Sequence, residues 1–141
     1  MTLPAKRTLS QLLLPLLALS LAACGSAVST ASFKGEEHAV AQAIANLQSD
    51  VREASQQKVC SDDLSSAVVS AVGGPTRCPQ AIKGQLSEVD SFEVAVTSVH
   101  LDTASKPPTA TARVKSTYAG KSQSRTITMV KEGGKWKLSR L

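Results

Sequence analysis

The sequence predicts an α+β domain in which N-terminal helices pack on one face of a curved four-stranded antiparallel meander. Two observations carry this prediction. Apolar residues recur at steps of three and four in the first part of the chain, and from Phe92 onward they alternate with polar residues. Helices that precede all the strands are typical of a layer of helices set against an antiparallel sheet.

Helical spacing predicts a first helix from Glu36 to about Val59. Glu36 and Glu37 lie in its opening turn, where carboxylates favour the positive end of the helix dipole. The expected apolar stripe comprises Val40, Ala43, Ile44, Leu47, Val51 and Ala54. Because the stripe is narrow and rich in alanine, we expect this helix to lie close to the sheet.

A second helix is expected to begin with Ser61 as its N-cap and to end at Gly73-Gly74-Pro75. Asp62 and Asp63 would then lie in its first turn. Its expected apolar face comprises Leu64, Ala67, Val68, Ala71 and Val72. A short third helix is expected to begin near Pro79, with Ile82 and Leu86 as its anchors.

The first strand is predicted to run from Phe92 to Leu101. Val94 and Val96 share one parity and Val99 and Leu101 the other, which predicts a β-bulge near Thr97 or Ser98. The segment 103–108 is predicted to be a loop, because its paired prolines cannot continue a ladder.

Two glycine turns predict the register of the remaining strands. A two-residue turn at Ala119-Gly120 would pair Val114 with Arg125, Ala112 with Ile127 and Ala110 with Met129. A second turn at Gly133-Gly134 would pair Met129 with Leu138 and Lys131 with Trp136. Both turns give one apolar face and one polar face, which a wrong register would scramble.

The first residues have the pattern of an export signal. Lys6 and Arg7 precede an apolar run over 9–21, which is shorter than the roughly 20 apolar residues of a spanning helix. The run closes on Leu21-Ala22-Ala23-Cys24, which resembles the lipobox of bacterial lipoprotein precursors. The resemblance implies cleavage before Cys24, lipid attachment to its sulfur, and localisation on the extracytoplasmic face of the cell membrane. An ordinary secreted protein is the alternative.

These features divide the chain into a signal peptide over 1–23, a flexible tether over 24–35 and one domain over 36–141. The tether is rich in Ser, Ala and Thr. Cys60 and Cys78 remain as a pair in an oxidising compartment, which favours a disulfide. Metal binding is the rival use of two cysteines, but His38 and His100 are both distant in sequence.

The region from Phe92 to Leu141 resembles the C-terminal half of NTF2-like (cystatin-like) domains. The motif-like part is the ending Gly133-Gly134-Lys135-Trp136-Lys137-Leu138-Ser139-Arg140. The sequence is especially similar to small exported lipoproteins and low-molecular-weight secreted antigens of high-GC Gram-positive bacteria. The resemblance implies a cone-shaped pocket between sheet and helices, in which the enzymes of this class use an Asp or an Asp/His pair as acid or base.

No residue pattern here predicts catalysis, a cofactor or a metal. His100 is expected to face away from Val99 and Leu101, His38 to be solvated, and Asp90 and Asp102 to end a strand. The chain has no G-x-S-x-G, no H-E-x-x-H and no phosphate-binding glycine loop. We therefore predict a protein that is not an enzyme.

The net charge restricts the kinds of partner that the chain can bind. Without Lys6 and Arg7, 14 basic residues face 11 acidic ones, an excess too small to predict nucleic-acid binding. Arg113 and Lys115 share the outer sheet face and form a possible partner surface, with a solvated face as the alternative. Trp136 is expected in the core or in a pocket wall. We expect an envelope interaction domain, with a carrier of an apolar molecule or lipid, or an isomerase or cyclase, as alternatives.

Overall fold

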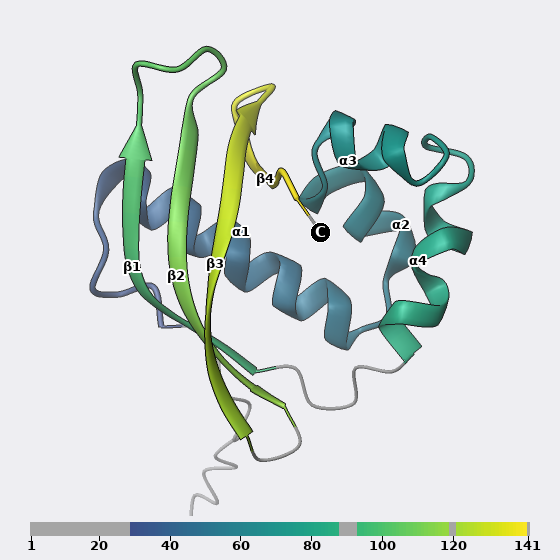
Figure 1. The fold of residues 1–141 in the computed structure, drawn as a ribbon, viewed down its shortest axis with the longest axis horizontal. Coiled ribbons are helices and arrows are strands. Elements are labelled where there is room, and N and C mark those ends of the chain that lie inside the picture. The colour runs from purple at the N-terminus through teal and green to yellow at the C-terminus, as the bar shows by residue number, and fades with distance from the viewer. Residues whose placement is uncertain (1–28, 88–92, 119–120, 141) are drawn as a thin grey trace, which may run out of the picture.

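The computed structural model describes residues 29–87, 93–118 and 121–140. Helices precede a four-stranded antiparallel sheet, so the predicted α+β class is confirmed (Figure 1). The elements are α1 (Gly35–Arg52), α2 (Gln56–Lys58), the π-helical turn η1 (Val59–Asp63), α3 (Ser66–Ala71), α4 (Cys78–Ser87), β1 (Glu93–Asp102), β2 (Thr109–Tyr118), β3 (Lys121–Glu132) and β4 (Lys135–Leu138). The expected signal peptide, Cys24, Asp90, Phe92 and the turn at Ala119-Gly120 lie outside the described residues.

The sheet is a meander with strand order β1-β2-β3-β4. Its register agrees with the predicted one at Ala112↔Ile127 in the β2–β3 pair and at Lys131↔Trp136 in the β3–β4 pair. The register between β1 and β2 shifts between Val96 and Ser98, where the change of parity predicts a bulge. One face of the sheet is therefore apolar and the other polar, as the alternation predicts.

The main core lies between α1 and the apolar face of the sheet, across which α1 runs (Figure 1). Its buried members are Val40, Ala41, Ile44, Val94, Val96, Ala110, Ala112, Val114, Met129 and Trp136. Ala41 and Ala112 are fully buried, so small side chains on both elements let the helix approach the sheet closely. Buried side chains thus fill the space in which the NTF2-like resemblance implied a pocket.

The first helix is shorter than predicted. It ends at Arg52 rather than near Val59, and Ala54 beyond it has a left-handed backbone with φ of 51°. That conformation costs an L-residue roughly 1–2 kcal/mol, and glycine is the residue that most often occupies such positions. Ala54 is exposed and outside the helix, so its expected place in the apolar stripe is also wrong.

The end of α1 has the hydrogen bonds of a Schellman motif. The Ser55 N–H donates to the Asp50 carbonyl at 2.9 Å, and the Ala54 N–H donates to the Val51 carbonyl at 3.0 Å. The motif satisfies carbonyls at the helix end and turns the chain back beside α1. No glycine occupies the left-handed position, and for that reason the sequence does not mark the end.

The second helix begins later than predicted. Ser61 lies within η1, in which the Leu64 N–H reaches back five residues to the Val59 carbonyl at 3.0 Å. The N-cap is Ser65, whose side chain accepts from the Val68 N–H at 3.4 Å. The buried residues of α3 are Val68 and Val69, whereas Ala67 and Ala71 of the expected face are exposed.

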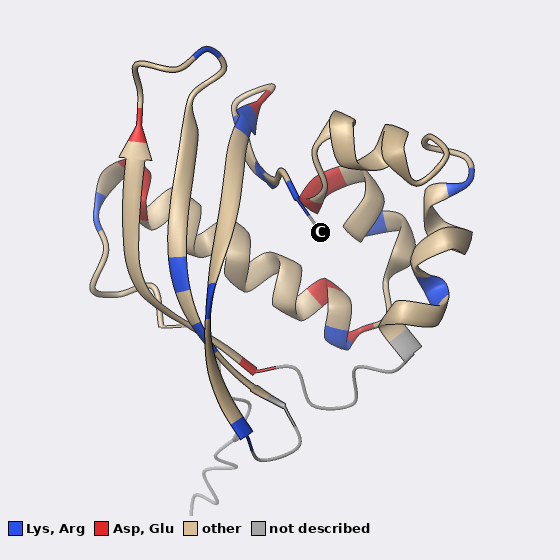
Figure 2. Ribbon diagram, viewed as in Figure 1, with Lys and Arg blue, Asp and Glu red and all other residues tan. Residues whose placement is uncertain are grey.

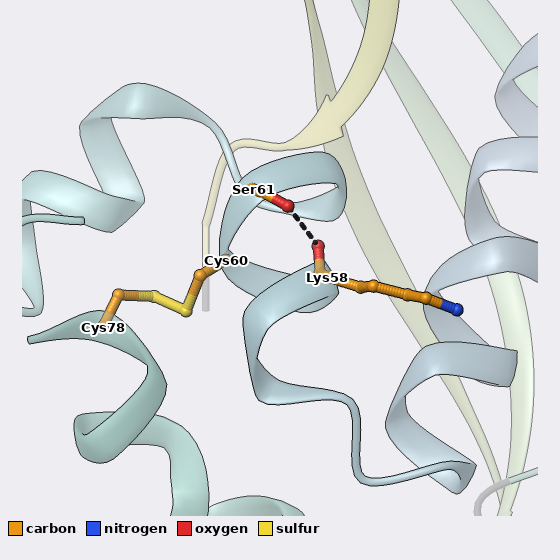
Figure 3. Close-up of a disulfide and its surroundings, with 4 residues drawn as sticks. All are labelled: Lys58, Cys60, Ser61 and Cys78. Atoms are coloured by element: carbon orange, nitrogen blue, oxygen red, sulfur yellow. Dashed lines mark hydrogen bonds between the residues drawn. A yellow bond between two sulfur atoms is a disulfide. The ribbon is translucent and has the colours of Figure 1, made fainter. Parts of the chain in front are cut away.

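A second core lies between α1 and the helical segment from α2 to α4 and includes a disulfide. Cys60 of η1 bonds to Cys78, the first residue of α4, with their Cα atoms 6.0 Å apart (Figure 3). The pairing agrees with the expectation, and α4 begins close to Pro79 as predicted. The buried members of this core are Leu47, Val59, Cys60, Leu64, Val68, Val69, Cys78 and Ile82.

Polar contacts hold the helical segment against β4 and the end of β3. The Ser65 N–H donates to the Leu138 carbonyl at 2.9 Å. Glu132 accepts from both the N–H and the hydroxyl of Ser66 at 2.9 Å, at the start of α3. These contacts join residues more than sixty positions apart, so the place of the short helices depends on the sheet.

The packed region extends upstream of residue 36. Phe33 is half-buried against the main core, and its N–H donates to the Thr30 carbonyl at 3.1 Å.

Within the described ranges, no helix is both long enough and apolar enough to cross a membrane.

Candidate functional site

A groove of about 660 Å³ runs between α1 and a wall formed by η1 and the β3–β4 hairpin. From α1 and the turn after it come His38, Ala39, Gln42, Ala43, Asn46, Ser49, Asp50 and Glu53. Across from them lie Lys58, Asp62, Asp63, Gly134, Lys135 and Trp136. The α1 residues recur at steps of three and four, so they lie on one face of the helix. Ten of the fourteen lining residues are polar or charged, whereas the interior beneath the sheet is apolar.

Carboxylates outnumber ammonium groups in this lining. Lys58 Nζ lies 3.4 Å from Asp50 Oδ1 and 3.7 Å from Glu53 Oε2, and Lys135 Nζ lies 3.3 Å from Asp62 Oδ1. Figure 3 shows the Lys58 side chain extending away from the disulfide, toward α1. Acidic positions at the end of α1 and in η1 are red in Figure 2. With Asp63 also in the wall, four carboxylates share the groove with two lysines.

Asp63 is the one carboxyl of this lining that is buried, with 7% of its surface exposed. Burial, followed by the charge and hydrogen bond of Asp50, raises the pKa of Asp63 to about 7. Asp62 acts in the same direction, and Lys137 opposes it. Its Oδ2 has no hydrogen-bond partner among the described residues. Asp63 therefore holds its proton up to near neutral pH, beside Asp50.

Trp136 belongs both to the main core and to the groove wall. It is 5% exposed, and its Nε1 donates to Glu36 Oε2 at 2.8 Å. Lys131 Nζ lies 2.8 Å from Glu36 Oε1 and 5.8 Å from the centre of the Trp136 ring. The hydrogen bond from Lys131, followed by that from Trp136, lowers the pKa of Glu36. Trp136 therefore fits both roles that the sequence left open.

Arg113 and Lys115 lie on the opposite face of the sheet from this groove. Both are exposed, and Arg113 pairs with Ser98 and Thr126. The three residues expected at a pocket or partner surface therefore do not form one site, because only Trp136 faces the groove.

The candidate acids and bases are also scattered. His100 is exposed on the outer sheet face, where it pairs with Thr111. Asp102 accepts from the N–H groups of Ala104 and Ser105 at 3.1 and 3.2 Å and so stabilises a turn. His38 is exposed at one end of the groove. In the part of the chain that the structure describes, no three His, Cys, Asp or Glu residues could hold a metal ion together.

Sequence reasoning missed Asp50 and Asp63 as a site. The sequence pattern places Asp63 in the first turn of a helix, where an acidic residue needs no further explanation. Asp50 is a polar residue on a helix whose other face is buried. Neither position carries a sequence signal, because their proximity arises from the turn that folds η1 back beside α1.

The fold and the groove define a small disulfide-linked α+β domain with a polar, acidic concave surface. The chain belongs to the family described as low molecular weight antigen MTB12, C-terminal domain, whose model matches residues 39–141. The expected similarity to low-molecular-weight antigens is thereby supported. No curated protein matches the chain significantly.

Proposed function

We propose that this chain is a lipid-anchored, non-enzymatic binding domain of the cell envelope, which holds a partner in the groove between α1 and η1. Lipid on Cys24 would hold the domain at the extracytoplasmic face of the membrane. The lipobox-like Leu21-Ala22-Ala23-Cys24 supports the anchor. A family of low-molecular-weight antigens is compatible with an envelope or secreted protein that is not an enzyme.

The groove is the observation that carries the binding role. It is concave, and it offers carboxylate, amide, hydroxyl and ammonium groups along one side of α1. A surface with many polar groups suits a polar partner better than an apolar one. We also infer an NTF2-like ancestry from the order of helices and meander, although in this chain the space beneath the sheet is packed.

That packing weighs against the two alternatives. A carrier of an apolar molecule needs an open apolar cone, but Val40, Ile44 and Met129 fill the space between α1 and the sheet. An isomerase or cyclase of this class needs an acid or base in the cone. Among the described residues, the buried polar or charged ones are Gln48, Asp63 and Ser65, and the one that ionises, Asp63, lies in η1 at the groove.

Site-specific photo-crosslinking in the native host tests the binding role. A photoreactive residue at Asn46 reports on the groove, and one at Thr126 on the outer face is the matched control. We expect a discrete adduct from Asn46 and none from Thr126. An adduct from Thr126 alone would place binding on the outer face, and no adduct from either would overturn the binding role.

Fractionation of the Cys24→Ala variant tests the anchor. Without a sulfur to acylate, the protein should leave the membrane fraction while its domain stays folded, since Cys24 precedes the packed region. A Cys24→Ala variant that remained fully membrane-bound would contradict lipid anchoring. Intact mass spectrometry of the wild-type protein should show the added lipid.

A further inference from the structure

We propose that the groove binds an extended peptide segment of a partner protein and seats one lysine or arginine side chain between Asp50 and Asp63. This inference rests on the proposed binding role and names the chemistry of the ligand. It draws on the charge of the groove, an unpartnered buried oxygen, and the length and polarity of the α1 face.

The charge of the groove favours a cationic ligand. The whole chain carries a net charge of +5, yet four carboxyl side chains share the groove with two lysines. Lys58 and Lys135 each contact a carboxylate there, and even while Asp63 holds its proton, the three other carboxylates outnumber the two lysines. A basic side chain would therefore find a local field opposite in sign to that of the protein as a whole.

The buried oxygen of Asp63 shows where that cation would sit. A buried acceptor without a donor is costly, and Oδ2 of Asp63 has no partner within the described residues. Asp63 lines the groove. For its buried Oδ2 to meet a ligand there, the carboxyl group would have to rotate about its terminal torsion, and such torsions are broad. An ammonium or guanidinium group has several N–H donors and can bridge both carboxylates. The proton that Asp63 held would then pass to solvent.

The α1 face favours a peptide over a small amine. From His38 to Glu53 the lining covers about 22 Å at 1.5 Å per residue, which matches roughly six or seven extended residues. Gln42 and Asn46 lie along this length, with the Gln42 Nε2 donating to Asn46 Oδ1 at 3.0 Å. Their exposed amides can exchange this bond for bonds with a peptide backbone. Ala39 and Ala43 leave room for a chain to lie close to the helix.

Calorimetric titration of the full-length protein in detergent tests the proposal. The probe is an acetylated, amidated alanine hexapeptide with one central lysine, and the control peptide has norleucine in its place. We expect the lysine peptide to bind at least about tenfold more tightly, because only its ammonium can pair with the carboxylates. An arginine peptide should behave like the lysine peptide. Equal binding of the norleucine peptide, or no binding of the lysine peptide, would overturn the proposal.

Three variants locate the binding. Asp63→Asn and Asp50→Asn should each raise the dissociation constant of the lysine peptide by about tenfold or more. Each substitution removes a carboxylate that the bound ammonium group would contact. Glu37→Gln is the matched control: it removes an exposed α1 carboxylate outside the groove lining and should leave the dissociation constant within about twofold. Circular dichroism verifies that each variant is folded. Asp63 and Asp50 variants that both fold and both bind normally would contradict the site.

Titration with a small diamine distinguishes a lysine side chain of a peptide from a free amine as the ligand. Pentane-1,5-diamine should bind more weakly than the lysine peptide, because it makes no backbone contacts along α1. Diamine binding as tight as that of the peptide would show a small-molecule amine site and overturn the peptide inference. If the lysine peptide did not bind in these titrations while Asn46 still formed a crosslink in cells, the basic ligand would be rejected. The groove would then remain the proposed binding surface.

Discussion

The indole Nε1 of Trp136 donates a hydrogen bond of 2.8 Å to Oε2 of Glu36, one hundred residues earlier in the chain. The bond joins β4 to the first turn of α1, and Lys131 of β3 binds the same carboxylate. One acidic side chain thus connects the first helix to the last two strands. Because Trp136 is buried in the main core and also lines the groove, this contact positions the groove wall against α1.

Replacing Trp136 with Phe should lower the free energy of unfolding by about 1–3 kcal/mol. The variant loses the N–H donor and part of a buried ring, so a hydrogen bond and apolar contacts are both removed. Urea denaturation measures the change. Glu36→Gln is the companion variant. It keeps an acceptor for the indole, so its loss in the free energy of unfolding should be smaller than that of the Phe variant. A larger loss for Glu36→Gln would show that the ion pair with Lys131, and not the indole, holds this junction.

Removing the disulfide should destabilise the domain by about 2–4 kcal/mol. Cys60 and Cys78 are separated by 18 positions, and the crosslink restricts the unfolded chain over that loop. The Cys60→Ala/Cys78→Ala variant keeps both positions apolar in the second core. Urea denaturation with and without reductant provides the test. Reductant should destabilise the wild-type protein by a similar amount and leave the double variant unchanged, and an insensitive wild-type protein would contradict the prediction.

Asp63 should make the protein less stable as pH rises. Its pKa is about 7 in the fold against an ordinary value of 3.8, so the folded state holds a proton between those values that the unfolded state has released. The stabilisation is complete below pH 3.8 and is lost as pH rises to about 7. The change of the Asp63 pKa from 3.8 to about 7 corresponds to a loss of roughly 4 kcal/mol at most. Asp62 and Lys137 also act on it, in opposite directions.

The Asp63→Asn variant isolates that contribution. An amide resembles the protonated carboxyl, so variant and wild type should have similar stability near pH 4. The variant should become the more stable protein by pH 8, since it has no proton to lose. Urea denaturation across this pH range measures the difference. A difference that did not change with pH would show that Asp63 ionises normally in the fold.

Ala54→Gly should raise the free energy of unfolding by about 0.5–1 kcal/mol. Glycine adopts the φ of 51° at this position without steric cost, which outweighs the entropy it adds to the unfolded chain. Ala81→Gly, at an exposed position of α4, is the matched control and should cost roughly 1 kcal/mol. If both glycines destabilised the protein equally, the left-handed turn at Ala54 would carry no strain.

Much of the sheet could be predicted from the sequence because its determinants are local. Alternation fixes which face is apolar, and the glycine pair at 133–134 fixes how β3 meets β4. Even the bulge beside Val96 follows from a change of parity. The third helix and the cysteine pair could likewise be predicted, since proline marks a helix start and few other uses of two cysteines fit an exported domain.

The helical segment could not be predicted to the same degree. The end of α1 depends on a left-handed alanine, and η1 and the Ser65 cap depend on contacts with β4, more than sixty positions away. Such contacts leave no periodic pattern in the sequence.

By itself, therefore, the sequence determined the class of fold, the register of the meander and the residues that the sheet contributes to the main core. The tertiary structure alone decided that Asp63 is buried beside Asp50, with Trp136 in the same groove. The physical reason is that burial and the approach of two charges depend on how distant segments pack, whereas periodicity and turn chemistry operate between neighbours in the chain.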